Sequence, residues 1–238
     1  MRLRNIPTAR TELEECPFVL DADAARKLRG RWAEEFRRRA GVSAPSDISG
    51  LSSQYPGKRE LHIEIGMGKG RFLMELARKH PETDYIGIEQ YSSVLVHAAR
   101  KMNALADAGD CPGNLLLIRM NAELLPDIFA PSEVDRIYLN FSDPWPKDRH
   151  AKRRLPGRVY LSRFAAVLSP GGSLEFKTDN RPLFDFALEE SAVAGWHLSQ
   201  VTYDLHSDPV MRSGNVMTEY EERFSAMGNP IFKLVEYP

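Results

Sequence analysis

The chain has 238 residues, of which 42% are hydrophobic and 27% are charged, and its formal net charge is −1 at pH 7. At this length one α/β domain can bury a full core without disulfides or metals, and no apolar run is long enough to cross a membrane, so we expect a soluble cytoplasmic protein. Because the charges balance, net charge alone does not indicate nucleic-acid binding. Cys16 and Cys111 lack the spacing of a metal site or a redox pair, which predicts two free thiols and no metal.

The first 57 residues are expected to form a basic appendage to the main domain. Residues 1–20 show no hydrophobic period and no apolar segment, which predicts a partly mobile arm without a signal peptide. An aspartate at position 21 or 23 can cap a following helix. One face of that helix would carry Leu28, Trp32 and Phe36. Its other face is rich in arginine, which indicates either a solvated surface or a contact with RNA.

Residues 41–57 are rich in serine, proline and glycine and are predicted to be a linker, so we divide the chain into residues 1–57 and 58–238. Beyond the linker, strand and helix patterns alternate. We predict strands at 61–65, 84–89, 115–120, 134–141, 173–177, 197–204 and 231–237, and helices at 71–80, 92–107, 159–168 and 182–194. The alternation predicts an α/β fold with a mostly parallel seven-stranded sheet, helices on both faces, and the last two strands as an antiparallel pair at one edge.

A glycine-rich loop follows the first strand of the main domain. The run from Glu64 through Gly66, Gly68 and Gly70 leads into a helix, where glycines let the backbone approach a nucleotide cofactor closely. The dinucleotide fingerprint would need a glycine at position 71, which is Arg71 here. An acid two residues before G-x-G-x-G instead resembles the first motif of S-adenosylmethionine-dependent methyltransferases, whose cofactor carries an ammonium group that Glu64 could attract. A tight turn without a ligand is the alternative.

Two further strand ends offer contacts to a nucleotide cofactor. Glu89 ends the second strand, where an acid can accept hydrogen bonds from both hydroxyls of a ribose, as in NAD enzymes. Asn121 follows the third strand, where its amide oxygen can accept from the exocyclic amine of adenine. The alternatives are a solvated acid for Glu89 and a turn-forming residue for Asn121.

Residues 140–154 join an acid, a rigid aromatic turn and a cationic run in the order N-F-S-D-P-W-P-K-D-R-H-A-K-R-R. The prolines must end the preceding strand, since proline has no N–H for a sheet ladder, so Asp143 lies at the strand's carboxyl end, where open α/β sheets bind ligands. The basic residues that follow suit the phosphates of a polyanion. They are Lys147, Arg149, Lys152, Arg153 and Arg154. A surface loop with solvated basic side chains is the alternative.

Two later segments should reach the same edge of the sheet. Asp179 ends the fifth strand and would lie on the same carboxyl edge as Asp143, unless it only caps the following helix. The segment Thr218-Glu219-Tyr220-Glu221 supplies acceptors and an aromatic ring that could hold a base. An amphipathic surface turn is the alternative for this segment.

With these motifs in order, the chain resembles the bacterial tRNA (guanine-N7-)-methyltransferases. The resemblance extends from about residue 61 to the C-terminus, through H-I-E-I-G-M-G-K-G, Y-I-G-I-E, Y-L-N-F-S-D-P-W-P-K-x-R-H-x-K-R-R, F-K-T-D-N and T-E-Y-E-E-R-F-S-A-M-G. It implies a Rossmann-like class I methyltransferase domain, S-adenosylmethionine as the cofactor, and tRNA as the partner of a monomer or homodimer. The implied reaction is methyl transfer to N7 of a guanine, at position 46 in the variable loop.

The resemblance also implies roles for individual residues. The cofactor would be bound by Glu64, Gly66, Gly68, Gly70, Glu89, Asn121 and Asp143, and Asp143 is also the catalytic candidate. The substrate would be bound by Lys147, Asp179, Thr218, Glu219, Tyr220 and Glu221. We expect phosphate contacts from Arg149, Lys152, Arg153 and Arg154. The family often has aspartate where this chain has Asn121, whose amide oxygen still accepts from adenine.

The implied reaction needs no proton removal, because guanine N7 carries an in-plane lone pair and no proton. Orientation and electrostatics must then supply most of the catalysis, and a carboxylate such as Asp143 near the ring would stabilise the positive charge that moves onto the purine.

Three other functions compete with this one. D-P-W-P is similar to the D-P-P-[aromatic] loop of amino-methyltransferases, which act on an exocyclic nitrogen; a nicotinamide oxidoreductase is disfavoured by the glycine spacing; a non-catalytic RNA-binding module would leave the acids and glycines without a purpose.

Overall fold

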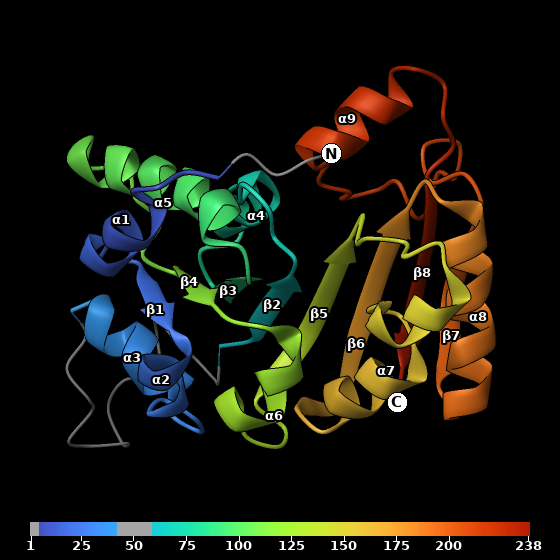
Figure 1. Cartoon of the computed structure of the whole chain (residues 1–238), viewed down its shortest axis with the longest axis horizontal. Helices are drawn as coiled ribbons and strands as arrows, with labels where there is room; N and C mark the ends of the chain where they lie inside the picture. Colours follow the sequence, from blue (N-terminus) through green and yellow to red (C-terminus); the bar gives the residue numbers. More distant parts are fainter. Residues whose placement is uncertain (1–4, 42–58) are drawn as a thin grey trace.

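The computed structural model describes residues 5–41 and 59–238 (Figure 1). Within these residues an eight-stranded sheet crosses the molecule in the order β1-β4-β3-β2-β5-β6-β8-β7. The strands are β1 (Val19–Asp21), β2 (Leu61–Ile65), β3 (Asp84–Glu89), β4 (Leu115–Arg119), β5 (Val134–Asn140), β6 (Leu168–Thr178), β7 (His197–Thr202) and β8 (Phe232–Tyr237). Neighbouring strands are parallel except at β8, which is antiparallel to both β6 and β7.

The predicted α/β fold with a mostly parallel sheet is confirmed. All seven predicted strands are present as β2 to β8, and the last two form the expected antiparallel pair at one edge. The eighth strand, β1, was not predicted, because three residues are too short to show a period of two. It lengthens the sheet by pairing with β4 at the opposite edge (Figure 1).

Helices cover both faces of the sheet (Figure 1). The described helices are α1 (Ala9–Glu15), α2 (Ala22–Arg26), α3 (Trp32–Arg39), α4 (Arg71–Lys79), α5 (Ser92–Asp107), α6 (Leu125–Ile128), α7 (Arg158–Ala165), α8 (Arg181–Ala194) and α9 (Glu219–Ser225), with 3-10 turns η1 (Ala122–Leu124) and η2 (Asp148–Arg153). One apolar cluster joins the sheet to α2, α3, α6, α7 and α8, and a second joins it to α1, α4 and α5. None of the described helices is both long and apolar enough to span a membrane.

The N-terminal segment departs most from the prediction. Residues 5–20 do not form an arm apart from the domain, because α1 buries Ala9 and Leu13 in the cluster with α5. The single helix predicted after residue 21 is wrong: α2 ends at Arg26, and α3 starts at Trp32 after Gly30, which has a φ of 77°. Trp32 is fully buried against Phe129, with ring centroids 5.6 Å apart.

The predicted linker, residues 41–57, lies outside the described residues apart from Gly41. The division into residues 1–57 and 58–238 therefore stays a proposal, although β1 and α3 share the sheet and the core of the rest of the chain. Cys16 and Cys111 are free, as predicted, and burial raises the pKa of both thiols.

Candidate active site

The glycine-rich loop forms an open cradle at the carboxyl end of β2. Gly66, Gly68 and Gly70 have φ values of 77°, 59° and 79°, a left-handed conformation that favours glycine. A side chain built at Gly68 would meet no atom within 4 Å, whereas one at Gly70 would lie 2.7 Å from the methyl group of Met67. Gly70 is thus required for packing at the start of α4, and the first two glycines border free space in which a ligand can contact the backbone.

Glu89 is oriented by this loop. Its Oε2 accepts from the Gly68 N–H at 3.3 Å, and its Oε1 accepts from the Tyr91 N–H at 2.9 Å. Each carboxylate oxygen has a second lone pair, so both can still accept from hydroxyl groups. Burial raises the pKa of Glu89, and the negative charge of Asp143 raises it further.

Glu64 has one carboxylate oxygen without a partner inside the protein. Its side chain is on β2 and only 2% of the residue is exposed. Oε1 accepts from the Asn140 amide at 2.8 Å, while Oε2 is buried and has no hydrogen-bond partner. Burial raises the pKa of Glu64 to about 7, against the hydrogen bond of Asn140 and the charge of Lys177. A buried acceptor without a partner is costly, and a donor such as an ammonium group would satisfy it.

Asn140 was not predicted as a site residue. The available signal was its place at the end of β5, directly before the loop of Asp143. Its partner Glu64 lies on a neighbouring strand, 76 positions earlier in the chain.

Asn121 follows β4 and lines a cavity of about 420 Å³. Its Oδ1 already accepts from the Glu123 N–H at 2.9 Å and so caps η1. The cavity is also lined by Gln90, which follows Glu89, and by Arg10 of α1. The N-terminal segment thus contributes side chains to this edge of the sheet, which the sequence did not indicate.

The loop after β5 is strained and held by one arginine. Phe141 and Trp145 have φ values of 53° and 42°, which side-chain-bearing residues rarely adopt and which often occur at functional sites. Arg154 donates to the carbonyl oxygen of Pro144 at 3.0 Å and to that of Trp145 at 3.1 Å. This loop presents Asp143 as an exposed carboxylate just beyond the carboxyl end of β5.

The cationic run surrounds this loop on the surface. Four of its basic residues are exposed: Lys147, Arg149, Lys152 and Arg153. Arg153 lies over the ring of Trp145, 4.9 Å from its centroid. Arg154 differs from the others, because it is half-buried, holds the loop carbonyls and lies 4.6 Å from the centroid of Phe186. The structure thus uses Arg154 within the loop, and its phosphate contact stays a prediction.

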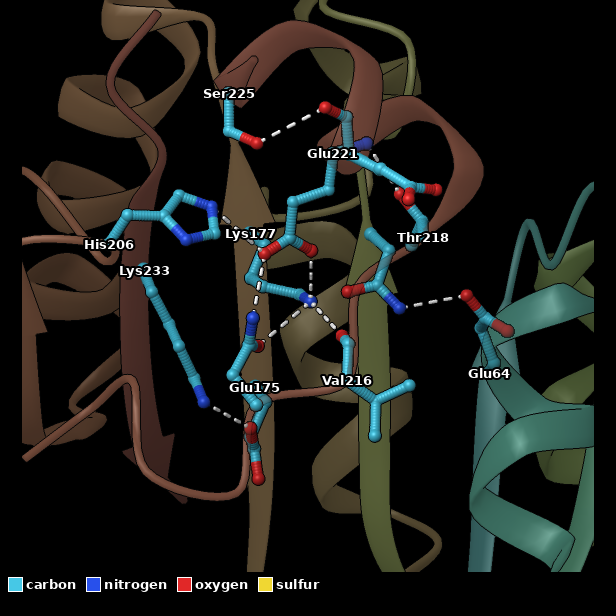
Figure 2. A network of polar contacts seen from close by, with 12 residues as sticks. Glu64, Glu175, Lys177, His206, Val216, Thr218, Glu221, Ser225 and Lys233 are labelled. Carbon is cyan, nitrogen blue, oxygen red and sulfur yellow. Dashed lines mark hydrogen bonds and ion pairs between the residues drawn. The ribbon is translucent and has the colours of Figure 1, made fainter. Parts of the chain in front are cut away.

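Asp179 meets α9 above the end of β6. Its Oδ2 accepts from the Tyr220 hydroxyl at 2.9 Å. The Thr218 hydroxyl caps α9 by accepting from the Glu221 N–H, and Glu219 pairs with Lys101 at 3.0 Å. The Glu221 side chain is completely buried and points toward Lys177 on β6 (Figure 2).

The arrangement suits a cationic ligand with hydroxyl groups. Three carboxylates, those of Glu64, Glu89 and Asp143, gather at the carboxyl ends of β2, β3 and β5 beside the glycine cradle. The exposed basic run next to them suits a polyanion. In the described part of the chain, no three His, Cys, Asp or Glu side chains are grouped to hold a metal.

Comparison with known proteins identifies relatives along the whole chain. The family model described as "Putative methyltransferase" matches residues 58–234. A tRNA (guanine-N(7)-)-methyltransferase of Lachnoclostridium phytofermentans is 50% identical over 237 residues, which cover 100% of this chain and 98% of that protein. The enzyme of the same name from Bacillus subtilis is 43% identical and covers 85% of this chain and 93% of its own.

Solved structures of low sequence identity share the fold. A protein titled an antibiotic related methyltransferase has a TM-score of 0.57 at 22% identity, covering 74% of this chain and 86% of its own. The 16S rRNA methyltransferase KamB has a TM-score of 0.56 at 20% identity, covering 81% and 92%. These likenesses show the class I methyltransferase fold.

Proposed function

Because the chain belongs to the family of tRNA (guanine-N7-)-methyltransferases and uses S-adenosylmethionine as its cofactor, we propose that its target is the guanine at position 46 in the variable loop of tRNA. The observation that carries the proposal is the meeting of three carboxylates and a glycine cradle with an exposed cationic loop at one edge of the sheet. The first part suits the cofactor and the second suits RNA. We place the reaction in the cytoplasm, where tRNA is the partner.

The residues at the cradle fit the cofactor. The unpartnered Oε2 of Glu64 would accept from the ammonium group, and the two oriented oxygens of Glu89 would accept from the ribose hydroxyls. Asn121 would lie at the adenine, with its remaining amide N–H groups and one lone pair available. When bound, S-adenosylmethionine supplies an electrophilic methyl group on a positively charged sulfur.

Asp143 would act on the guanine. Its carboxylate is exposed, and a carboxylate can accept from both N1–H and the amino group of guanine, which fixes the plane of the base. The same negative charge would stabilise the positive charge that develops on the purine. No residue has to remove a proton, since N7 carries none.

The remaining site residues would hold the tRNA. Phosphates would be contacted by the exposed basic residues Lys147, Arg149, Lys152 and Arg153, which set orientation without reading sequence. Arg154 would act through the loop that it supports. The base and its neighbours would meet Asp179, Thr218, Glu219 and Tyr220, which lie at or near the surface.

The test is methyl transfer from labelled S-adenosylmethionine to an unmodified tRNA transcript, followed by identification of the methylated nucleoside. We expect N7-methylguanine in this transcript and none in a matched transcript that lacks the variable-loop guanine. Label at another guanine would overturn position 46 and leave the reaction standing. An N-methylated exocyclic amine would favour the amino-methyltransferase alternative.

A further inference from the structure

A buried lysine on β6 holds the segment that carries α9. The Lys177 ammonium is hydrogen-bonded to Glu221 Oε2 at 2.6 Å, the Val216 carbonyl at 3.0 Å and Asn215 Oδ1 at 3.3 Å (Figure 2). These three acceptors match the three N–H donors of a lysine. Lys177 is 3% exposed and Glu221 is 0% exposed, so the pair is shielded from solvent. Each N–H of the Lys177 ammonium therefore has an acceptor, which offsets the cost of burying its charge.

Glu221 is held from its other side as well. Its Oε1 accepts from the Asn215 amide at 2.8 Å, and His206 Nε2 lies 3.4 Å away, within ion-pair distance but without hydrogen-bond geometry. Asn215 therefore bridges both members of the pair. Through these contacts, residues of β6, α9 and the preceding loop form one polar cluster (Figure 2).

Polar contacts matter for α9 because its apolar side chains, Tyr220 and Phe224, are not fully buried. A cavity of about 350 Å³ is lined by Lys177, Asn215 and Val216 on one side and by Phe72 of α4 on another. The helix α9 has seven residues, and such a short helix is marginal unless tertiary contacts hold it. Among residues 219–225, only Glu221 is buried. Glu221 is thus the buried anchor of α9, whose exposed residues Glu219 and Tyr220 contact Lys101 and Asp179.

The exposed face of α9 carries the groups that would meet tRNA. Tyr220 donates to Asp179 and its ring lies 4.8 Å from that of Phe141, the strained residue two positions before Asp143. Tyr220 also stacks on Phe224 at 4.0 Å. A shift of α9 would therefore move Tyr220 relative to the loop that presents Asp143.

We propose that the Lys177–Glu221 pair, bridged by Asn215, positions α9 so that Tyr220 and Asp179 meet the tRNA beside Asp143. Lys177 and Glu221 are positioning residues that act through α9 and do not touch the substrate. This inference rests on the proposed function, and it reassigns Glu221 from direct substrate binding to support of the substrate surface.

The decisive variant removes both charges together, as Lys177→Met with Glu221→Gln. Removing one partner would leave a buried charge unpaired and would strongly destabilise the protein. Lys177 also faces Glu64, whose ionisation it favours, so a change of net charge would disturb the cofactor site as well. The double variant keeps the net charge of the pair and leaves the hydrogen bond between Glu64 and Asn140 in place, and the Kd of S-adenosylmethionine reports any effect of the lost Lys177 charge on Glu64.

A neighbouring ion pair supplies a matched control. Lys233 of β8 and Glu175 of β6 lie 2.8 Å apart on the same face of the sheet, with side chains 12% and 16% exposed, and neither contacts α9 (Figure 2). The control is Lys233→Met with Glu175→Gln. It removes a partly buried Lys–Glu pair that joins β6 to β8, and the new amide oxygen at position 175 can still accept from Arg136, the other partner of Glu175.

Two measurements separate positioning from a general loss of stability. In the Lys177→Met/Glu221→Gln variant, we expect the amides of residues 219–225 to exchange at least about tenfold faster with solvent, while those of α8 are unchanged. We expect KM for tRNA to rise about tenfold, with the Kd of S-adenosylmethionine changed less than about threefold. The control variant should show neither effect.

Unchanged exchange of residues 219–225 would show that the pair does not hold α9, and an unchanged KM despite faster exchange would show that α9 does not position tRNA. If the control variant showed the same faster exchange and the same rise in KM, the effect would be a general loss of stability and not a loss of positioning. Failure of the parent protein to methylate N7 of guanine would instead overturn the proposed function. The exchange measurement and direct binding of tRNA would then still test the positioning role.

Discussion

Three carboxylates at the cofactor edge of the sheet differ in role because their surroundings differ. Glu64 is buried with one free oxygen, Glu89 is buried and oriented by two backbone N–H groups, and Asp143 is exposed. All three were predicted at strand ends from the sequence. The different exposure of the three, and the raised pKa values of Glu64 and Glu89, follow from burial that the whole fold creates and that no local pattern contains.

The affinity for S-adenosylmethionine should depend on the ionisation of Glu64. Its pKa is about 7, and Asn140, Lys177 and Glu89 are the groups that influence it. Because the ammonium group needs an ionised partner, we expect affinity to fall about tenfold between pH 8 and pH 6. Titration calorimetry at these two values measures this. Glu64→Gln should bind weakly at both, and a flat profile in the parent protein would contradict the role.

The same shift has a defined effect on stability. The pKa of Glu64 is raised from 4.5 in the unfolded chain to about 7 in the folded one, so the folded state binds more protons between these values. The contribution of Glu64 to the free energy of unfolding is therefore greatest below pH 4.5 and declines as the pH rises to about 7.

Asp143→Ala should reduce turnover far more than tRNA binding. We expect kcat to fall about a hundredfold or more, since loss of one preorganised electrostatic contact in an active site has this effect. The Kd for tRNA should change only slightly, because phosphate contacts supply most of the affinity. Asp148→Ala, an exposed acid in the adjacent 3-10 turn, is the control and should keep both values. Equal losses of turnover and binding would make Asp143 chiefly a binding residue.

Among the elements, those with a clear hydrophobic period were predictable and those held by tertiary contacts were not. The helices α4, α5 and α8 and the seven longer strands follow from sequence periodicity. The short helix α9 was read only as acceptors and an aromatic ring, because its anchor is a buried charge pair with β6. Likewise, the loop of Asp143 was correctly placed, but its support by Arg154 arises only in three dimensions.

The cationic loop should act through charge alone. Lys152→Ala with Arg153→Ala removes two exposed charges from η2, so tRNA affinity should fall and the slope of log K against log salt should decrease by about 2. Cofactor affinity should not change. Salt-dependent binding of a tRNA transcript measures this slope. Arg78→Ala with Lys79→Ala, at the far end of α4, is the matched control. An unchanged slope in the first variant would place the RNA elsewhere.

At the scale of the whole molecule, the N-terminal segment is part of the core. Trp32 is fully buried, its indole N–H donates to the Ile128 carbonyl at 3.1 Å, and β1 extends the sheet. Glu12 pairs with Arg100 of α5, which lowers the pKa of this carboxyl to about 2. We infer that this segment folds together with the methyltransferase core.

Trp32→Ala should therefore destabilise the entire protein. We expect the free energy of unfolding to fall by about 3–5 kcal/mol in a single cooperative transition, because a large buried side chain is lost. Denaturant unfolding followed by circular dichroism measures this. Val193→Ala, at a residue that is 62% exposed, is the control and should have little effect. A small loss for Trp32→Ala, or a separate early transition, would support an appendage that folds independently.

The sequence alone determined the alternation of strands and helices, the order of the motifs and the edge of the sheet at which they meet. These features are local: period, glycine and proline position, and the common direction of parallel strands. Only the tertiary structure decided that Asn140 completes Glu64, that Lys177 holds Glu221, and that β1 joins the sheet. Such contacts join residues 76 and 44 positions apart in the first two cases, and their stability depends on burial created by the whole fold.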